Sequence, residues 1–357
     1  MDFELSEDQV ALQEAARQLL DGLADPSRVR AHLASADAYD QPLWDAMVEQ
    51  GWLGIALPES HGGIGLTWVE AAVLLEEVGR HAAPVPLLSQ LLALDALATA
   101  GDDRTAGLAD GSVLGCVAWS RQPRAVRAEG DGMSWKLTGR PDPVTGASSA
   151  DLAVVWTPDA VFAVDLATTG RPVAEPAMDG TRTISWLELD GTPAIKLGGA
   201  DVARDLLDRG AVGVAALLLG GAAHVLEMTA QYAKDRIQFG QPIGSFQAVK
   251  HRCADMVVDV EGMRSTAWYG AWSIAAGDPD ASVAASTAKI WCSDAARRVM
   301  ASGLQVHGGI GFTWEHDLHL YLKRAQLDAL TFGDASYHRD RLAGLLRAKV
   351  DAGVSVI

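Results

Sequence analysis

A glycine-containing turn beside an arginine is the first place where this sequence could bind a ligand. The stretch reads Arg236-Ile237-Gln238-Phe239-Gly240-Gln241-Pro242-Ile243-Gly244-Ser245-Phe246-Gln247. Such a turn exposes backbone N–H groups near a helix N-terminus, where an anion is held favourably. Arg236 would add a charge-assisted contact to a phosphate, and Phe239 a flat apolar surface for a ring. On spacing alone, however, an ordinary corner between two helices is the favoured interpretation.

A second stretch places three glycines in four positions, which lets a backbone approach a ligand closely. It reads Gln305-Val306-His307-Gly308-Gly309-Ile310-Gly311-Phe312. The spacing does not match G-x-G-x-x-G, and a helix rather than a strand precedes it, so it is no dinucleotide fingerprint. Taken alone, it is better explained as a helix cap followed by a loop.

Single residues offer weaker candidates. His316 and His319 could lie on one helix face like a metal pair, but no third ligand is evident, so surface histidines are expected and no metal site. His307 could line a ligand channel or pack at a helix end. The scattered thiols Cys116, Cys253 and Cys292 argue against disulfides and zinc, and fit a reducing compartment.

Composition excludes several functions. The 357 residues include 46 acidic and 29 basic ones, for a formal net charge of −17, so a broad basic patch for nucleic acid or an anionic membrane is not expected. The longest apolar run, residues 211–223, is shorter than the about 20 residues of a membrane span. The N-terminus is acidic where a signal peptide would be basic, which predicts a cytoplasmic protein.

The elements that must position these residues follow a helical, β, helical order, which is an α+β fold. Residues 1–110 read as an N-terminal helical domain, opened by a capping box from Ser6 to Gln9. Residues 111–198 read as a middle antiparallel β domain, with turns at Asp131-Gly132 and Asp190-Gly191. Residues 199–357 read as a C-terminal four-helix bundle. Its helices carry apolar stripes at Phe246, Val249, Cys253, Met256, Val260 and Met263, and at Ala288, Trp291, Ala295 and Val299.

Together the two glycine-rich stretches resemble the acyl-CoA dehydrogenase family. The family patterns are R-x-x-F-G followed by G-x-F-Q, and Q-x-x-G-G-x-G. They are met by Arg236, Phe239, Gly240, Gly244, Phe246 and Gln247, and by Gln305, Gly308, Gly309 and Gly311. The N-terminal stretch from Gly51 to Gly65 also resembles the family, so that the likeness covers essentially the full chain.

The resemblance implies a cofactor, a reaction and a partner. In the family, these two motifs bind the ADP half of a FAD whose flavin lies on the neighbouring subunit, so the cofactor is shared across the subunit interface. The reaction is α,β-dehydrogenation of an acyl-CoA, in which a glutamate removes the α proton and the flavin accepts the β hydrogen. Electron-transfer flavoprotein is the expected electron acceptor.

The sequence departs from the family where the base and the flavin contacts are expected. The two known positions of the glutamate correspond to Gly333 and Gly210, and Asp334 is only a weak substitute, more simply an exposed helix-start residue. The early strand segment from Cys116 to Arg121 keeps none of the usual flavin contacts. Of the W-[IV]-[ST] element, only Thr145 survives as a flavin-site residue, because Pro143 replaces the indole.

Retaining one half of the site predicts the base-lacking subunit of a heteromeric enzyme, inactive alone. Similar heteromers occur in actinobacterial pathways for bulky, often steroid-derived acyl-CoAs, with two copies of each chain. A self-sufficient homomeric flavoenzyme with a relocated base, or with oxidase or monooxygenase chemistry, is the second hypothesis. A flavin-free scaffold protein is the third.

Overall fold

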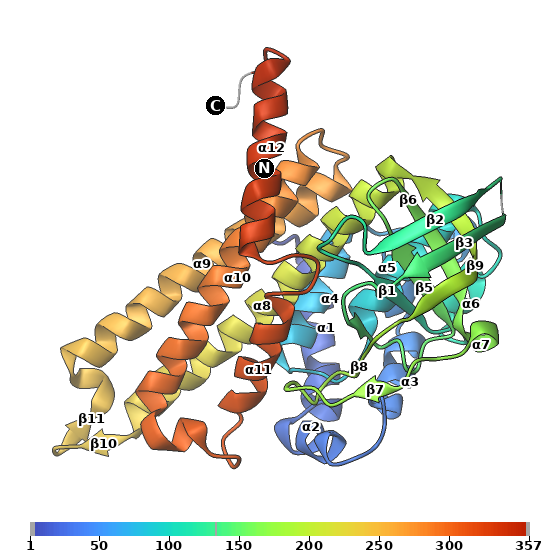
Figure 1. Ribbon diagram of the computed structural model, residues 1–357. Coiled ribbons are helices and arrows are strands. Elements are labelled where there is room, and N and C mark those ends of the chain that lie inside the picture. The colour runs from blue at the N-terminus through green and yellow to red at the C-terminus, as the bar shows by residue number, and fades with distance from the viewer. Residues whose placement is uncertain (1–3, 133, 355–357) are drawn as a thin grey trace. The chain divides into compact units, whose positions relative to one another are not determined.

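The computed structural model describes residues 4–132 and 134–354, which form two compact units. One unit comprises Met1–Arg28, Ala72–Ala83 and Ala211–Ile357, and is helical apart from one short hairpin. The other comprises Val29–Ala71 and Pro84–Gly210, and contains the main β-sheet. Two helices, α4 (Trp68–Arg80) and α8 (Ala200–Asp235), run from one unit into the other (Figure 1). The α+β fold, with helices before and after the strands, is confirmed.

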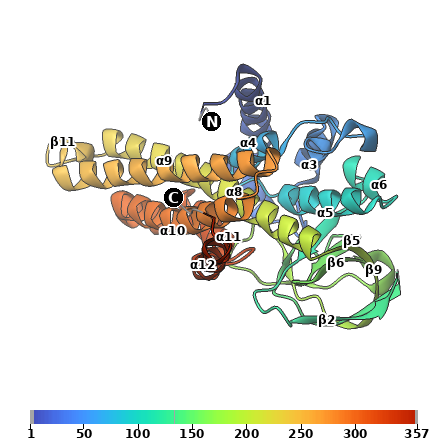
Figure 2. The same ribbon diagram turned by 90° about the horizontal axis from the view of Figure 1, so that it is seen from above.

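The helical unit is built around long helices that run side by side in both views (Figures 1 and 2). Its further elements are α1 (Glu7–Leu23), β10 (Ile237–Gln238), β11 (Gln241–Pro242), η3 (Ile243–Ser245), α9 (Gln247–Ala275), α10 (Ala281–His307), η4 (Gly308–Phe312), α11 (Leu318–Asp328) and α12 (Ala335–Asp351). The predicted capping box at the start of α1 is confirmed: Ser6 Oγ accepts from the Gln9 N–H at 3.2 Å, and the Gln9 side chain accepts from the Ser6 N–H at 3.0 Å.

The predicted stripes explain how α9 and α10 pack. Met256, Val260 and Met263 of α9 are buried, as are Ala288, Ala295 and Val299 of α10. The prediction is wrong at the start of the α9 stripe, where Phe246, Val249 and Cys253 are only half-buried. It is also wrong at Trp291, because 40% of it is exposed and its ring lies against Gly262 of α9, where a Cβ would come within 2.4 Å of the indole nitrogen.

Two buried glutamates of α4 tie other helices of this unit to it. Glu76 accepts from the Arg264 guanidinium at 2.9 Å and from the Trp268 indole at 3.1 Å. Glu77 pairs with Arg17 of α1 at 2.7 Å. Both carboxylates are paired and hydrogen-bonded, which is the condition under which a buried charge is tolerated.

The second unit places a helical layer beside a six-stranded sheet of order β1-β5-β6-β9-β3-β2. The helices are α2 (Pro26–Leu33), α3 (Gln41–Glu49), η1 (Trp52–Gly54), η2 (Glu59–His61), α5 (Leu87–Ala100), α6 (Thr105–Ala109) and α7 (Leu166–Thr169). The strands are β1 (Gly115–Ala118), β2 (Val126–Asp131), β3 (Ser134–Gly139), β5 (Leu152–Trp156), β6 (Ala160–Asp165) and β9 (Leu189–Gly199), with β4 (Val144–Thr145), β8 (Ile184–Ser185) and β7 (Ala174–Glu175) in a smaller sheet.

Two details of the β prediction are wrong. The sheet is not wholly antiparallel, because β1 pairs with β5 in parallel. Asp190-Gly191 does not reverse the chain but lies inside β9, where the register against β3 shifts between Leu137 and Gly139. The φ of +60° at Gly191 and its N–H bond to the Thr138 hydroxyl at 3.1 Å mark a β-bulge, which uses the same residue types as a turn.

Helix α8 is longer than the apolar run suggested. It has 36 residues and is the one described helix whose length and composition would allow it to cross a membrane, contrary to the expectation that no segment is long enough. Of its most apolar 18-residue window, 78% is buried inside the protein, as is usual for a helix at the centre of a bundle.

Candidate cofactor-binding site

The first predicted stretch forms a two-residue hairpin between α8 and α9. β10 and β11 pair antiparallel, and the two residues between them, Phe239 and Gly240, have φ values of +54° and +79°. Positive φ at both central positions is the signature of the type I′ turn, which favours glycine and strains phenylalanine. Phe239 is 92% exposed and meets only the edge of Phe246, with ring centroids 6.0 Å apart. A strained, exposed aromatic residue is a candidate contact residue rather than a core residue.

The backbone of Arg236 is hydrogen-bonded on both sides, whereas its side chain is exposed. Its N–H donates to the Tyr232 carbonyl at 2.9 Å, and its carbonyl accepts from the Ile243 N–H at 2.8 Å. Within the described residues, its exposed guanidinium has no hydrogen-bond or ion-pair partner. The side chain is therefore available to an anionic ligand.

The N-terminus of α9 is also open. Phe246 occupies the N-cap position but makes no side-chain cap, so the first N–H groups of the helix have no side-chain acceptor. Gly244 lets the turn reach α8, since a Cβ there would lie 2.9 Å from the Ala233 carbonyl oxygen. An uncapped helix N-terminus beside an unpaired arginine fits a phosphate-bearing group such as the ADP portion of FAD.

The second predicted stretch lies at the same end of the bundle. His307, the last residue of α10, stacks on Tyr232 of α8 with ring centroids 4.6 Å apart, which joins the two stretches. The φ of +61° at Gly308 ends the helix, and Gln305 presents an exposed side chain one turn earlier. Gly311 is buried where a Cβ would lie 3.0 Å from that of His307. The glycines thus serve as helix cap and close contact, and ligand binding by Gln305, Gly308 and Gly309 stays a prediction.

His307 is a packed helix-end residue, as one of its two interpretations had it. It is 3% exposed, its Nδ1–H donates to the Gly303 carbonyl at 2.8 Å, and burial lowers its pKa. The edge of His316 meets its ring at 4.5 Å between centroids. His319 is half-buried rather than on the surface, and its ring contacts Trp314. The described residues contain no cluster of three or more side chains able to hold a metal ion.

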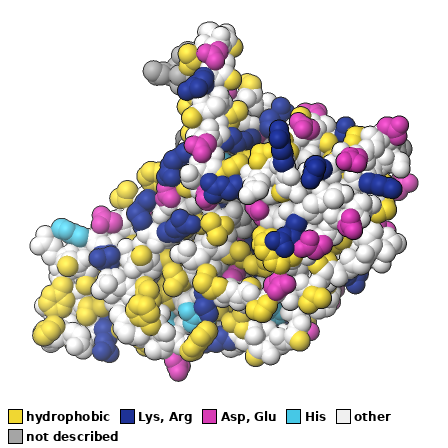
Figure 3. All heavy atoms as spheres, in the orientation of Figure 1, with side chains coloured by type: hydrophobic (Ala, Val, Ile, Leu, Met, Phe, Trp, Pro, Cys, Tyr) yellow, Lys and Arg dark blue, Asp and Glu magenta, His cyan; other side chains and the backbone are white. Residues whose placement is uncertain are grey.

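Apolar side chains gather around this end of the bundle, at the lower left of Figure 3. The bundle-end patch comprises Phe239, Phe312, Trp314, Ile237 and Ile310, which are between 46% and 92% exposed. A cluster of this kind on a folded protein marks an interaction surface more often than a solvent-facing one.

In the sheet unit, the segment expected to contact a flavin, Cys116 to Arg121, packs and bonds to other residues of the same unit. After β1, Trp119 is buried and packs on Trp156, with ring centroids 5.9 Å apart. The Ser120 hydroxyl donates to Asp142 at 3.2 Å, and the Arg121 N–H donates to the same carboxylate at 2.9 Å. Two polar donors of this segment are therefore bonded within the sheet unit. Thr145 is half-buried in β4, and its role stays a prediction.

The first base position, Gly333, leaves no room for a side chain. It is buried between α11 and α12 with a φ of +95°, and a Cβ would lie 2.4 Å from the Tyr337 ring. Asp334 is the N-cap of α12, and its carboxylate accepts from the Tyr337 N–H at 2.8 Å. It is half-buried rather than exposed as predicted, but its helix-start role is confirmed.

Two buried side chains, Lys289 and His338, bond to backbone carbonyls of the connection between α11 and α12. The Lys289 ammonium donates to Ser293 Oγ at 3.0 Å and to the carbonyls of Asp328 and Ala329 at 3.1 Å each, where it closes the C-terminus of α11. Burial lowers its pKa to about 7. The His338 Nε2–H donates to the Phe332 carbonyl at 2.8 Å, and burial lowers the pKa of this histidine to about 3.

The second base position, Gly210, is buried in α8. The neighbouring Arg209 pairs with Asp95 of α5 at 3.3 Å, and the same Asp95 oxygen accepts from the Trp68 indole at 2.8 Å. Burial raises the pKa of Asp95, and Arg209 lowers it. A carboxylate engaged by both an arginine and an indole is an ion-pair partner rather than an unpaired base.

The chain belongs to the acyl-CoA dehydrogenase family. Residues 6–105 match the N-terminal domain and residues 198–346 the C-terminal domain of acyl-CoA dehydrogenases. The chain is 35% identical to acyl-CoA dehydrogenase IpdE2 of Mycolicibacterium smegmatis, over 92% of this chain and 96% of that protein. Members of this family are FAD-binding oxidoreductases that act on acyl-CoA.

Solved structures with the same fold include two that pair different chains. The ChsE4-ChsE5 complex from Mycobacterium tuberculosis contains a chain 32% identical to this one, with a TM-score of 0.90 over 97% of this chain and 99% of that one. A variant of the Tcur3481-Tcur3483 steroid acyl-CoA dehydrogenase contains a chain 34% identical, with a TM-score of 0.89 over the same shares.

Three residues that hold the candidate site in shape belong to no sequence motif. They are Tyr232, Asp142 and Lys289, and each contacts residues distant in sequence. Of the three, only Lys289 could have been found from the sequence. It follows the run of small residues from Ala284 to Ala288, and a lysine beside such a run predicts a buried charge with a specific partner.

Proposed function

We propose that this chain is the base-lacking subunit of a heteromeric FAD-dependent acyl-CoA dehydrogenase. It would hold the ADP half of a FAD shared across the interface with a catalytic sister subunit, and be inactive alone. When bound, FAD supplies the two-electron acceptor for α,β-dehydrogenation. Removal of the α proton from the thioester would then fall to the sister subunit.

The geometry at Gly333 carries the proposal. A base needs a carboxylate that reaches the reacting carbon, and this position is a buried glycine in the left-handed region with a tyrosine ring against it. Lys289 and His338 hold the loop in that shape by hydrogen bonds to its carbonyl groups. The loop is therefore built without a base and without space for one.

The bundle end supports the other half of the proposal. Arg236 and the open N-terminus of α9 offer a charged side chain and backbone donors for phosphates, and Phe239 offers a ring surface. The contacts of Ser120 and Arg121 to Asp142 support the absence of the usual flavin contacts after β1. A chain that can bind the nucleotide but not the ring needs a second chain to complete the cofactor site.

The comparisons support the assembly and the substrate class. Two of the similar structures contain chain pairs, and one of them is described as a steroid acyl-CoA dehydrogenase. We therefore expect a heterotetramer with two copies of each chain, a bulky or steroid-derived acyl-CoA as substrate, and electron-transfer flavoprotein as acceptor. The bundle-end patch is the surface expected to meet the sister subunit. A cytoplasmic location completes the proposal.

Expression of the chain alone and together with the product of the neighbouring open reading frame tests this function. Bound flavin and dehydrogenation of a steroid-type acyl-CoA, followed with an artificial electron acceptor, should appear only on co-expression. Yellow, active protein from the chain alone would instead establish a self-sufficient enzyme. A stable, colourless protein under both conditions would establish a flavin-free scaffold.

A further inference from the structure

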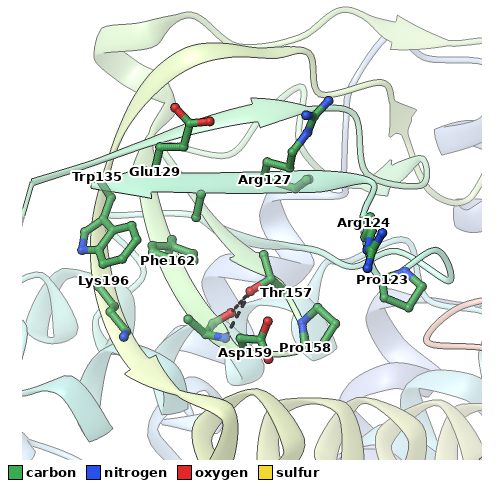
Figure 4. A pocket seen from close by; sticks show the side chains of 13 residues that line it. Pro123, Arg124, Arg127, Glu129, Trp135, Thr157, Pro158, Asp159, Phe162 and Lys196 are labelled. Atoms are coloured by element: carbon green, nitrogen blue, oxygen red, sulfur yellow. Dashed lines mark hydrogen bonds between the residues drawn. The ribbon is translucent and has the colours of Figure 1, made fainter. Parts of the chain in front are cut away.

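A cavity of about 730 Å³ opens in the sheet unit. It lies between the β2–β3 hairpin and the turn that joins β5 to β6, and β9 borders it on one side (Figure 4). This volume lies within the range of about 300–1,000 Å³ found for small-molecule sites.

The cavity has an aromatic floor. Trp135 of β3 and Phe162 of β6 lie in contact, with ring centroids 5.4 Å apart and planes 55° from parallel. Val126 and Ala128 of β2 add apolar surface, because alternate residues of a strand face the same side. Phe162 is 1% exposed, whereas Trp135 is only half-buried and leaves part of its ring open to a ligand.

Two cations face the cavity from opposite ends. Lys196 Nζ lies 5.4 Å from the centroid of the Trp135 ring, and Arg124 stands at the other end beside Pro123 (Figure 4). Among the residues that the structure describes, neither cation has an ion-pair or hydrogen-bond partner for its side chain. The other charged residues that line the cavity are Asp159, Glu129 and Arg127, of which the last two point away from the aromatic floor (Figure 4).

The uncharged polar groups of the floor are already satisfied. The Trp135 indole N–H donates to the Gly132 carbonyl at 2.9 Å. The Thr157 hydroxyl donates to the Ala160 carbonyl at 2.8 Å and accepts from the Ala160 N–H at 3.1 Å. These two uncharged groups therefore do not require a ligand with matching donors and acceptors, and an apolar ring system needs none.

We propose that this cavity binds a ligand that combines a flat apolar ring system with one anionic group. The rings would lie on the exposed part of Trp135, which Phe162 supports from within, and a carboxylate or sulfonate would pair with Lys196 or Arg124. Among the lining residues, three cations against two carboxylates give the site its preference for an anion.

Two fluorescent probes that differ only in charge test this site on the full chain. Anilinonaphthalene sulfonate carries the anionic group, and N-phenylnaphthylamine is the same ring system without it. The charged probe should bind the wild-type chain more tightly, and Lys196→Gln and Arg124→Gln should each weaken it about tenfold, the size of one charge-assisted contact. Asp159→Asn should tighten binding of the charged probe.

Lys136→Gln is the matched control, since Lys136 is an exposed cation of β3 that does not line the cavity. Binding of the charged probe should not change in this variant, and far-ultraviolet circular dichroism should match the wild type for all four proteins. The proposal is overturned if the two probes bind equally well. It is also overturned if Lys136→Gln weakens the charged probe as much as Lys196→Gln does, because binding would then follow net charge rather than this cavity.

Discussion

At the scale of single residues, glycine at position 333 is a structural requirement and not merely a lost glutamate. Its φ of +95° favours glycine, and the Tyr337 ring occupies the space that a Cβ would need. A glutamate at this position would therefore meet both backbone strain and the Tyr337 ring.

A matched pair of substitutions tests this adaptation. Gly333→Glu should lower the free energy of unfolding by at least about 1–3 kcal/mol from backbone strain alone, and more from the clash with Tyr337. Gly344→Glu, in the exposed middle of α12 with open space around it, should leave stability unchanged or raise it by about 1 kcal/mol. Melting temperatures of the two variants measure the difference. A Gly333→Glu chain as stable as the wild type and active alone would mean that this loop can still present a base.

At the scale of elements, the connection from α11 to α12 depends on a histidine that must stay neutral. His338 is fully buried, and burial lowers its pKa to about 3, from an unfolded value of about 6.5. Lys289 and Arg341 lower the pKa further, and Asp334 opposes them. Because the unfolded chain takes up the proton first on acidification, this histidine costs no stability above pH of about 6.5, and stability falls as the pH drops below that value.

Replacement of this residue isolates its contribution. His338→Gln keeps a donor for the Phe332 carbonyl but cannot titrate. Between pH of about 7 and about 5, the wild type should lose more melting temperature than the variant, because one extra proton is worth about 1.4 kcal/mol per pH unit. Identical pH profiles for the two proteins would show that His338 titrates normally.

Local patterns predicted the helices better than the strands. The stripe from Met256 to Met263 identified the buried face of α9, because a helix repeats every 3.6 residues whatever its partner is. The prediction of a turn at Asp190-Gly191 is wrong because a β-bulge and a turn need the same residue types. Only the pairing with β3 distinguishes the two. The parallel pairing of β1 with β5 likewise depends on contacts distant in sequence.

At the scale of the whole molecule, the two motifs predict a nucleotide-binding end of the helix bundle. They do not predict the side-chain contacts that form the rest of the expected cofactor site. Arg236 and Gln305 were found because their patterns are local. The Tyr232–His307 stack that joins the two motifs, and the Asp142 carboxylate that occupies the donors after β1, arise only when distant segments fold together. These contacts are thus outcomes of tertiary structure that no local motif contains.

The central claim is that this chain contributes the nucleotide half of a FAD site in a complex with a catalytic sister subunit. Its most direct test is the flavin-to-protein ratio of the co-purified complex carrying Arg236→Ala. The ratio should fall while both chains still purify together, and Arg347→Ala, an exposed arginine on α12, should leave it unchanged. An unaltered flavin content in the Arg236→Ala complex would contradict the claim.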